Sequence, residues 1–357
     1  MKFLNIYKDT KSQAEQALLS TWTPGNNHKM RQAFKDLFER ECLLAEPVFQ
    51  SSFGWQTTDS DIWRNYLSPS MVDKLGIFTD YAPYTHQVES WMHLDDAQGT
   101  KPFKSITVTS GTGSGKTECF LYPILSDLYS RINMPSAIEA IFLYPLNALM
   151  KDQKARLGRN CEKLGISFAS YNGLTPEGGT KTSGKFPNTE LCTRTQIRKN
   201  IPRILLANPS ILEFILVRQK DQEMIERSRG RLKWIVIDEA HTYSGSAAAE
   251  LKNQIRRILD AFGVKKDKVH FACTSATISG SDGEANLRRF ISDLTGQDIE
   301  RIHVIGGTRV VPELKENEIS ALLPENLDTK NVLKASYEIF KIYLVNKFKF
   351  VDLCRCC

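Results

Sequence analysis

The sequence lacks the marks of membrane, secreted and disordered proteins. No apolar run approaches the roughly 18 residues that a membrane-spanning helix needs. Residues 1–11 contain no apolar segment of the kind that secretory signals carry. Charged residues make up 25% and hydrophobic residues 41% of the chain, which excludes extensive disorder. We therefore expect a folded cytoplasmic protein without a membrane partner.

Cysteines are present but are not spaced as a disulfide framework. Five of the eight stand singly between residues 42 and 273, as in reduced intracellular proteins. The other three are Cys354, Cys356 and Cys357. We interpret them as an unstructured tail, with the start of a zinc site as the alternative.

The chain has only a modest excess of basic residues. Lys and Arg number 47 against 41 acids, a net charge of +6, which permits a nucleic-acid partner but does not demonstrate one. Residues 172–200 are rich in Gly, Thr, Lys and Asn and are predicted to form an exposed loop. The basic residues in and beside this loop either follow the phosphates of a strand or are simply solvated. They are Lys181, Lys185, Arg194, Arg198, Lys199 and Arg203.

Three regions differ in their residue pattern. Residues 1–80 are predicted to form a small helical accessory layer, whose aromatic residues either pack on the next domain or stack on nucleic acid. Residues 81–306 alternate short apolar runs with helical segments, which predicts an α/β fold with a parallel sheet covered by helices on both faces. Residues 307–357 are interpreted as an incomplete C-terminal extension. The predicted strands are 105–109, 140–144, 167–171, 203–207, 234–238, 270–274 and 301–305.

A glycine-rich loop follows the first predicted strand and precedes a helix. Its residues are Ser110, Gly111, Thr112, Gly113, Ser114, Gly115, Lys116 and Thr117. Glycines let backbone N–H groups surround phosphate oxygens, and the helix N-terminus adds a partial positive charge. Lys116 would reach the β- and γ-phosphates, and Thr117 would ligate Mg²⁺. The usual motif has glycine where this chain has Ser110, but the cradle itself is formed by residues 113–117.

Two carboxylates close a later apolar strand. Asp238 and Glu239 directly follow residues 234–237. A carboxylate at a strand end beside a phosphate loop can hold Mg²⁺, and an adjacent glutamate can deprotonate the attacking water. Lys116 and Glu239 are therefore the predicted catalytic residues, with Thr117 and Asp238 as the predicted Mg²⁺ ligands.

Two weaker motifs flank these blocks. Residues 274–277 follow a predicted strand, and residues 84–87 precede the glycine loop. A glutamine amide both donates and accepts, so Gln87 can read the edge of adenine.

These four blocks, in this order, resemble those of the superfamily 2 helicases of DEAD/DEAH type. The resemblance covers about residues 81–306 and implies a RecA-like fold and an ATP-dependent helicase or translocase. It implies that ATP is bound by Gln87, residues 110–117, Asp238 and Glu239. It also implies that His241, Ser275 and Thr277 couple the nucleotide state to the grip on nucleic acid. Two further segments resemble motifs Ia and Ib and imply contacts to a strand from Asn147, Ala148, Leu149, Asn208 and Pro209.

Residues 238–245 carry a closer resemblance, to the large bacterial helicases around Lhr and the mitomycin-repair helicases, including those of phage defence. This resemblance favours DNA over RNA. The DEAD-box subgroup usually has an aromatic residue at the position where this chain has Ser70, which departs from the adenine-stacking pattern.

The last departure lies downstream of Thr277. These helicases need a second RecA-like domain with arginine fingers, and no Q/H-R-x-G-R-x-G-R motif follows in residues 278–357. We therefore expect the ATP-binding half of a longer motor, inactive or very slow alone. It is either a truncated reading frame or a split gene product whose second RecA-like domain comes from another polypeptide. The alternatives are a non-catalytic ATP- and nucleic-acid-binding module and the motor part of a restriction system.

Overall fold

The computed structural model describes residues 2–23, 27–40, 54–58, 61–95, 103–111, 113–179, 184–275 and 283–310. The chain forms two compact units, Met1–Phe53 and Gly54–Cys357. The first contains helices α1 (Lys2–Trp22) and α2 (His28–Arg40), as the helical pattern predicts. The rings of Trp22 and Phe34 lie 5.7 Å apart between these two helices.

The second unit is built on an eight-stranded sheet with the order β4-β3-β5-β2-β6-β7-β1-β8. All of its strand pairs are parallel, which confirms the predicted fold class. The strands are β1 (Ser105–Val108), β2 (Ala140–Leu143), β3 (Phe168–Tyr171), β4 (Glu190–Leu191), β5 (Ile204–Ala207), β6 (Trp234–Ile237), β7 (His270–Thr274) and β8 (Ile302–Ile305).

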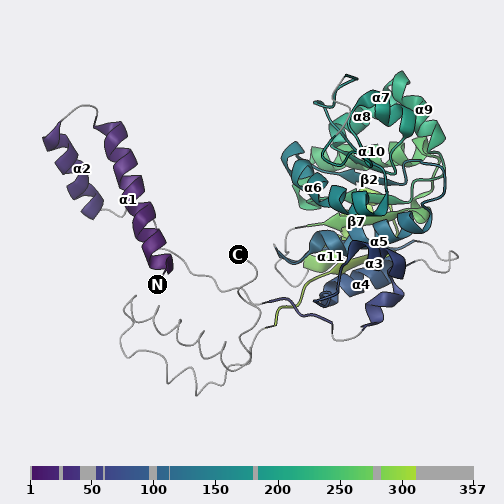
Figure 1. Cartoon of the computed structure of the whole chain (residues 1–357), viewed down its shortest axis with the longest axis horizontal. Coiled ribbons are helices and arrows are strands. Elements are labelled where there is room, and N and C mark those ends of the chain that lie inside the picture. Colours follow the sequence, from purple (N-terminus) through teal and green to yellow (C-terminus); the bar gives the residue numbers. More distant parts are fainter. Residues whose placement is uncertain are drawn as a thin grey trace, which may run out of the picture. The chain divides into compact units, whose positions relative to one another are not determined.

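Helices cover both faces of this sheet (Figure 1). Successive strand residues point to opposite faces, so Phe142 joins one hydrophobic cluster and Ile141 the other. Strands buried on both sides must be apolar throughout, which explains their uniform composition. The helices are α3 (Pro69–Leu75), α4 (Thr85–Leu94), α5 (Lys116–Ser130), α6 (Asn147–Leu164), α7 (Arg194–Asn200), α8 (Pro209–Val217), α9 (Gln219–Arg227), α10 (Ser246–Ala261) and α11 (Gly283–Thr295), with short 3-10 turns at Asp61–Asn65, Ala240–Thr242, Lys266–Lys268 and Ile299–Arg301.

The division between the units falls at Gly54, whereas the sequence pattern placed a domain boundary near residue 80. Trp63, Met71 and Trp91 are buried in the same hydrophobic cluster as Ile106 of β1. Residues 61–80 therefore pack with the sheet, because their apolar side chains are part of its core. The predicted extension 307–357 lies almost wholly outside the described residues.

Part of the stretch predicted as an exposed loop, residues 172–200, forms regular structure. β4 adds an edge strand, and α7 is capped by Thr193, whose hydroxyl accepts the N–H of Gln196 at 3.2 Å. Phe186 and Ile197 are buried. The polar composition of this stretch hid these two apolar anchors.

Neither a membrane span nor a metal cluster is found in the part of the chain that the structure describes. No helix there is long and apolar enough to cross a bilayer. No group of three or more His, Cys, Asp or Glu side chains in the same ranges is placed to hold a metal. Cys354, Cys356 and Cys357 lie outside these ranges, so the zinc alternative is untested.

Candidate nucleotide and nucleic-acid site

The predicted motifs meet at the carboxyl ends of three neighbouring strands. The order β6-β7-β1 places Asp238 after β6, Thr274 at the end of β7 and the glycine loop after β1. Ligands of open parallel sheets bind at this edge. The main chain connects the motifs there, since the N–H of Ser275 donates to the carbonyl of Val108 at 3.0 Å.

The glycine loop has the backbone conformation of a phosphate cradle. Gly113 and Gly115 have φ values of 75° and 71°, in the left-handed region that glycine adopts without strain. The buried hydroxyls of Ser110 and Ser114 lie 2.5 Å apart and brace the loop from within. Lys116 begins α5, so the N-terminus of that helix faces the loop. Thr112 lies outside the described residues.

Helix α4 holds the loop through side chains of the predicted adenine motif. Gln87 donates to the carbonyl of Gly115 at 3.2 Å and accepts the N–H of Tyr84 at 3.0 Å. The neighbouring His86 donates to the carbonyl of Ser114 at 2.8 Å. Gln87 therefore positions the loop, and a side chain at Gly115 would clash with its amide.

Thr274 links the two carboxylate residues of the site. Its hydroxyl donates to Asp238 Oδ1 at 2.5 Å and accepts the backbone N–H of Glu239 at 2.8 Å. Glu239 has φ 50° and ψ 48°, a left-handed conformation that is strained for a residue with a side chain. Strain of this kind persists where surrounding contacts impose it, as Thr274 does here.

The electrostatics of Asp238 fit a cation. Burial raises the pKa of this carboxyl group, and Glu239 raises it further, whereas the Thr274 hydrogen bond and the Lys116 ammonium lower it. The lysine of the glycine loop therefore lies close enough to act on this carboxylate. Because a buried carboxylate with an oxygen-rich neighbourhood suits Mg²⁺, Asp238 fits the metal that this loop implies. Thr117 lies in the first turn of α5 and stays a predicted ligand.

The predicted coupling residues are only partly described. His241 Nδ1 lies 3.3 Å from Glu239 Oε2, which connects it directly to the predicted base. Ser275 is fully buried, and its hydroxyl has no hydrogen-bond partner among the described residues. Thr277 lies outside them.

The segments resembling motifs Ia and Ib lie side by side at the same edge. β2 pairs with β5, with Leu143 opposite Ala207, and the amide of Asn208 donates to Asn147 Oδ1 at 3.0 Å. Asn147 and Ala148 are exposed, whereas Leu149 packs against the hydrophobic core. Pro209 begins α8, which the side chain of Asn208 caps by accepting the N–H of Ile211 at 2.8 Å.

Two residues that the sequence motifs do not include, far apart along the chain, also lie at the site. Trp55 and Arg309 form an antiparallel bridge, and the Arg309 guanidinium lies 4.1 Å from the centre of the Trp55 ring. Both lie within van der Waals reach of a β-carbon placed on Gly111, and Trp55 also contacts His86, ring to ring, at 5.7 Å. Ser70, at the expected aromatic position, is instead exposed on α3. The one feature of the sequence that pointed to Trp55 is the group of aromatic residues in the region 1–80.

The basic residues around 172–200 do not form one surface. Arg203 is 2% exposed and pairs with Glu139, so for Arg203 the expectation of a strand-facing or solvated residue is wrong. Arg198 is held by Glu177 and Asp221 at 2.5 and 2.6 Å. Lys181 lies outside the described residues.

A parallel sheet with a phosphate loop, paired acidic residues and a linking threonine at its carboxyl edge defines a RecA-like, P-loop nucleotide-binding protein. Comparison with known families then gives its family. Residues 84–285 match the model of the DEAD/DEAH box helicases, and the chain belongs to this family. The resemblance inferred from the motifs is thereby confirmed.

Individual relatives cover the chain only in part. It is similar to Druantia protein DruE of Escherichia coli (strain UMEA 4076-1), with 26% identity over 346 residues, 67% of this chain and 18% of DruE. It is also similar to the uncharacterized ATP-dependent helicase YprA of Bacillus subtilis (strain 168), with 30% identity over 221 residues, 61% of this chain and 25% of YprA. The chain thus spans about a fifth to a quarter of the length of these relatives.

A solved structure supports the fold. The DEAD-box helicase Mss116 bound to single-stranded RNA and UDP-BeF superposes with a TM-score of 0.54 at 15% identity, covering 83% of this chain and 54% of Mss116. At this identity the similarity concerns the fold alone.

Proposed function

We propose that this chain is the ATP-binding half of an ATP-dependent nucleic-acid helicase or translocase acting on DNA. The glycine-loop N–H groups and Lys116 hold the triphosphate, and Thr117 and Asp238 hold Mg²⁺. The metal, when bound, neutralises charge on the phosphates. Glu239 accepts the proton of the attacking water.

The observation that carries the proposal is the position of Thr274 between the two acidic residues. One hydroxyl orients Asp238 and fixes the main chain of Glu239, and Lys116 acts on the same carboxylate. A glycine loop that binds no nucleotide would not be expected beside such an arrangement. The site is thus organised for hydrolysis and not only for phosphate binding.

The base of ATP is proposed to lie beside Gln87 and Trp55. Gln87 uses its oxygen and one amide hydrogen to hold Tyr84 and the loop, which leaves a second amide hydrogen for adenine. Trp55 supplies an aromatic face beside Gly111, the role that Ser70 cannot fill.

Nucleic acid is proposed to cross the edge formed by Asn147, Ala148, Asn208 and Pro209. Amide side chains and helix N-termini suit the sugar–phosphate backbone, so binding should be tolerant of sequence. Leu149 supports this edge from the core. The preference for DNA rests on the resemblance carried by residues 238–245.

The test compares two single substitutions at the site. Lys116→Ala should weaken Mg-ATP binding at least tenfold, or about 1.4 kcal/mol, measured by titration with a fluorescent ATP analogue. Glu239→Gln should bind the analogue nearly as well as the wild type but lose hydrolysis, since it removes the base and keeps the metal ligands. Lys151→Ala, which removes an exposed lysine of α6, is the matched control. An equal loss of affinity in Lys116→Ala and Glu239→Gln would contradict the assigned roles.

A further inference from the structure

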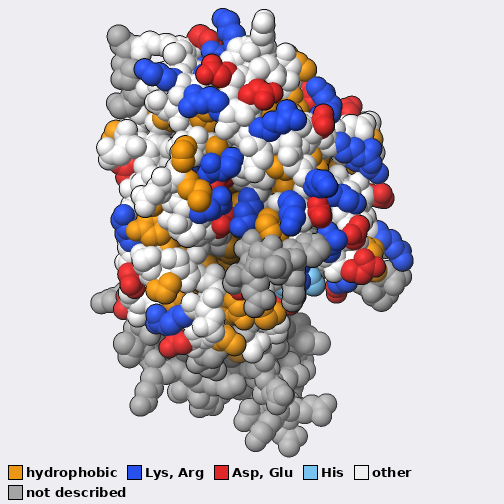
Figure 2. All heavy atoms as spheres, turned by 90° about the vertical axis from the view of Figure 1, so that its right-hand side faces the viewer, with side chains coloured by type: hydrophobic (Ala, Val, Ile, Leu, Met, Phe, Trp, Pro, Cys, Tyr) orange, Lys and Arg blue, Asp and Glu red, His pale blue; other side chains and the backbone are white. Residues whose placement is uncertain are grey.

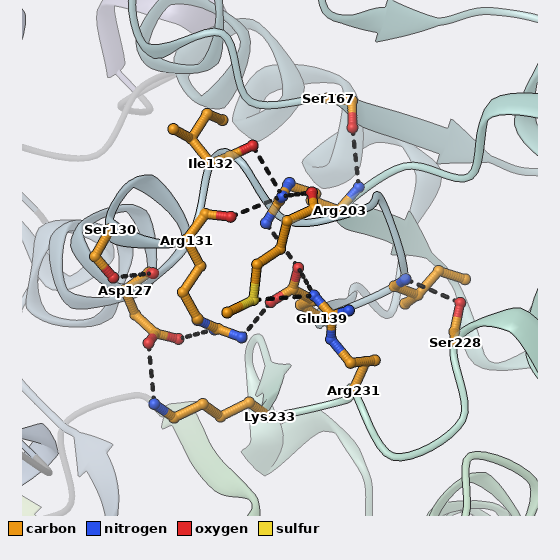
Figure 3. Close-up of polar contacts among 12 residues, drawn as sticks. Asp127, Ser130, Arg131, Ile132, Glu139, Ser167, Arg203, Ser228, Arg231 and Lys233 are labelled. Carbon is orange, nitrogen blue, oxygen red and sulfur yellow. Dashed lines mark hydrogen bonds and ion pairs between the residues drawn. The ribbon is translucent and has the colours of Figure 1, made fainter.

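A cluster of cationic residues that the proposed function does not use lies at the amino ends of the strands, opposite the nucleotide site. This end of the sheet is called the amino-end surface below. Glu139, which immediately precedes β2, is fully buried. Its carboxylate meets three guanidinium groups, those of Arg131 at 2.5 Å, Arg203 at 2.7 Å and Arg231 at 3.2 Å (Figure 3). One buried negative charge is thus shared by three positive charges.

A second carboxylate, that of Asp127, only partly balances this cluster. It lies 2.5 Å from Arg131 and 3.0 Å from Lys233 (Figure 3). It also accepts the indole N–H of Trp234 at 2.7 Å. Asp127 and Glu139 together therefore face Arg131, Arg203, Arg231 and Lys233. These six side chains together carry two more positive than negative charges.

The three arginines differ in what they can reach. The side chain of Arg203 is 3% exposed and donates to the carbonyls of Arg131 and Ile132 at 2.9 and 3.2 Å. It therefore caps the C-terminal end of α5. Burial lowers the pKa of its guanidinium, Glu139 raises it, and Arg131 and Arg231 lower it again. Arg131 and Arg231 are 23% and 29% exposed and carry the positive charge to the surface.

The adjoining surface extends the same charge along the sheet edge. Phe103 stacks on His270 at 4.2 Å, and the ammonium groups of Lys233 and Lys268 lie 5.3 and 6.0 Å from the centre of its ring. Lys104 and Lys268 are exposed. Figure 2 shows Lys and Arg side chains gathered across the middle of the face that includes this edge, with fewer acidic side chains among them.

The arrangement suits a chain of phosphates better than one small anion. Arg131 and Arg231 are fixed from beneath by Glu139, and a guanidinium held in place binds phosphate oxygens with little loss of entropy. The lysines continue the positive charge from β6 across β7 to β1, a row longer than a single phosphate needs.

We propose that this edge, defined by Lys104, Arg131, Arg231, Lys233 and Lys268, is a second binding surface for the sugar–phosphate backbone of nucleic acid. It rests on the proposed function in that the chain acts on nucleic acid. It is distinct from the edge formed by Asn147 and Asn208, which lies at the other ends of the strands. One domain thereby holds two stretches of nucleic acid on opposite sides.

The experiment measures binding of the 357-residue chain to a short labelled single strand and to the matching duplex by fluorescence anisotropy over a series of salt concentrations. The test variant is Lys104→Gln/Lys268→Gln, which leaves Glu139 and its arginines intact. The matched control is Lys220→Gln/Arg256→Gln, which removes two exposed charges from α9 and α10. Thermal unfolding checks that each variant is folded.

The test variant should bind less tightly, with a shallower dependence of log K on log salt. Loss of two phosphate contacts reduces that slope by about 1.4 on a single strand or about 1.8 on a duplex. The probe on which the slope changes identifies the form of nucleic acid that the surface holds. The control pair should keep the wild-type slope.

Two results would overturn the proposal and can be told apart. If the wild type binds and both double variants keep its affinity and slope, the amino-end surface is not used, while the proposed function stands. If the wild type binds neither probe at low salt, the nucleic-acid part of the proposed function fails with it.

Discussion

At the residue scale, the predicted catalytic base has a conformation that costs free energy. Glu239 has a left-handed backbone, imposed by the bond from its N–H to Thr274 and by the turn into residues 240–242. Its carboxylate is directed to His241 at 3.3 Å. This conformation lowers the free energy of unfolding and fixes the position of the carboxylate, a combination that is common at functional sites.

Glycine at this position should make the protein more stable and inactive. The left-handed conformation costs a side-chain-bearing residue about 1–2 kcal/mol, and the freedom of glycine in the unfolded chain returns about 0.4–1 kcal/mol of this. Glu239→Gly should thus gain about 0.5–1 kcal/mol in the free energy of unfolding, measured by urea denaturation. Glu239→Gln keeps the side chain and should gain nothing. A Glu239→Gly variant no more stable than Glu239→Gln would show that the backbone is not strained.

At the element scale, α4 connects the glycine loop to the edge of the sheet. Its first turn holds the loop through His86 and Gln87. Near its end His93 stacks on His303 of β8, with ring centres 3.8 Å apart. The ring of His303 therefore packs against a helix. Burial, with smaller contributions from His303 and Lys104, lowers the pKa of His93 to about 4. Burial also lowers the pKa of His303, as do Lys104 and Arg288.

This histidine pair should make stability depend on pH. In the unfolded chain histidine takes up protons near its ordinary pKa of about 6.5, whereas folded His93 resists protonation down to about 4. The unfolded state then binds more protons, so stability falls as the pH is lowered from about 6.5 to about 4. The Tm of His93→Gln/His303→Gln should fall less steeply over this range than that of the wild type. A residual slope is expected because burial also lowers the pKa of His86. Parallel Tm curves for the two proteins would contradict this assignment.

At the scale of the whole molecule, the site faces outward at one edge of a single RecA-like sheet. An arginine finger typically contributes about 10³ to 10⁵ in rate by neutralising charge on the γ-phosphoryl group. In this family that arginine belongs to a second RecA-like domain. The described residues are proposed to bind and position ATP, and closure over it is proposed to come from another domain.

The 357-residue polypeptide should therefore bind ATP yet hydrolyse it very slowly and unwind no duplex. Addition of a polypeptide carrying the second RecA-like domain should raise strand-stimulated turnover at least a hundredfold, a conservative part of the finger's range. Phosphate release with and without single-stranded DNA measures this. Brisk stimulated turnover by the polypeptide alone would refute the interpretation as half of a motor. No stimulation by the added domain would favour a non-catalytic binding module.

The sequence by itself determined the predicted strands, the glycine loop and the acidic pair, because each depends on neighbouring residues. Apolar runs of four or five residues must be buried, and glycines before a helix specify the cradle whatever surrounds them. The two-residue strand β4 and helix α7 were not predicted. Their formation depends on the burial of Phe186 and Ile197 against segments distant in sequence.

Only the tertiary structure decided which residues complete the site. Strand order places Thr274 between Asp238 and the glycine loop, and no local pattern contains that order. Trp55 reaches Gly111 through its bridge to Arg309, a pairing between segments near opposite ends of the sequence. Arg203, predicted as part of a basic loop, is buried against Glu139 at the amino ends of the strands. In each case the decisive contact joins segments that the sequence separates widely, so only the folded chain brings them together.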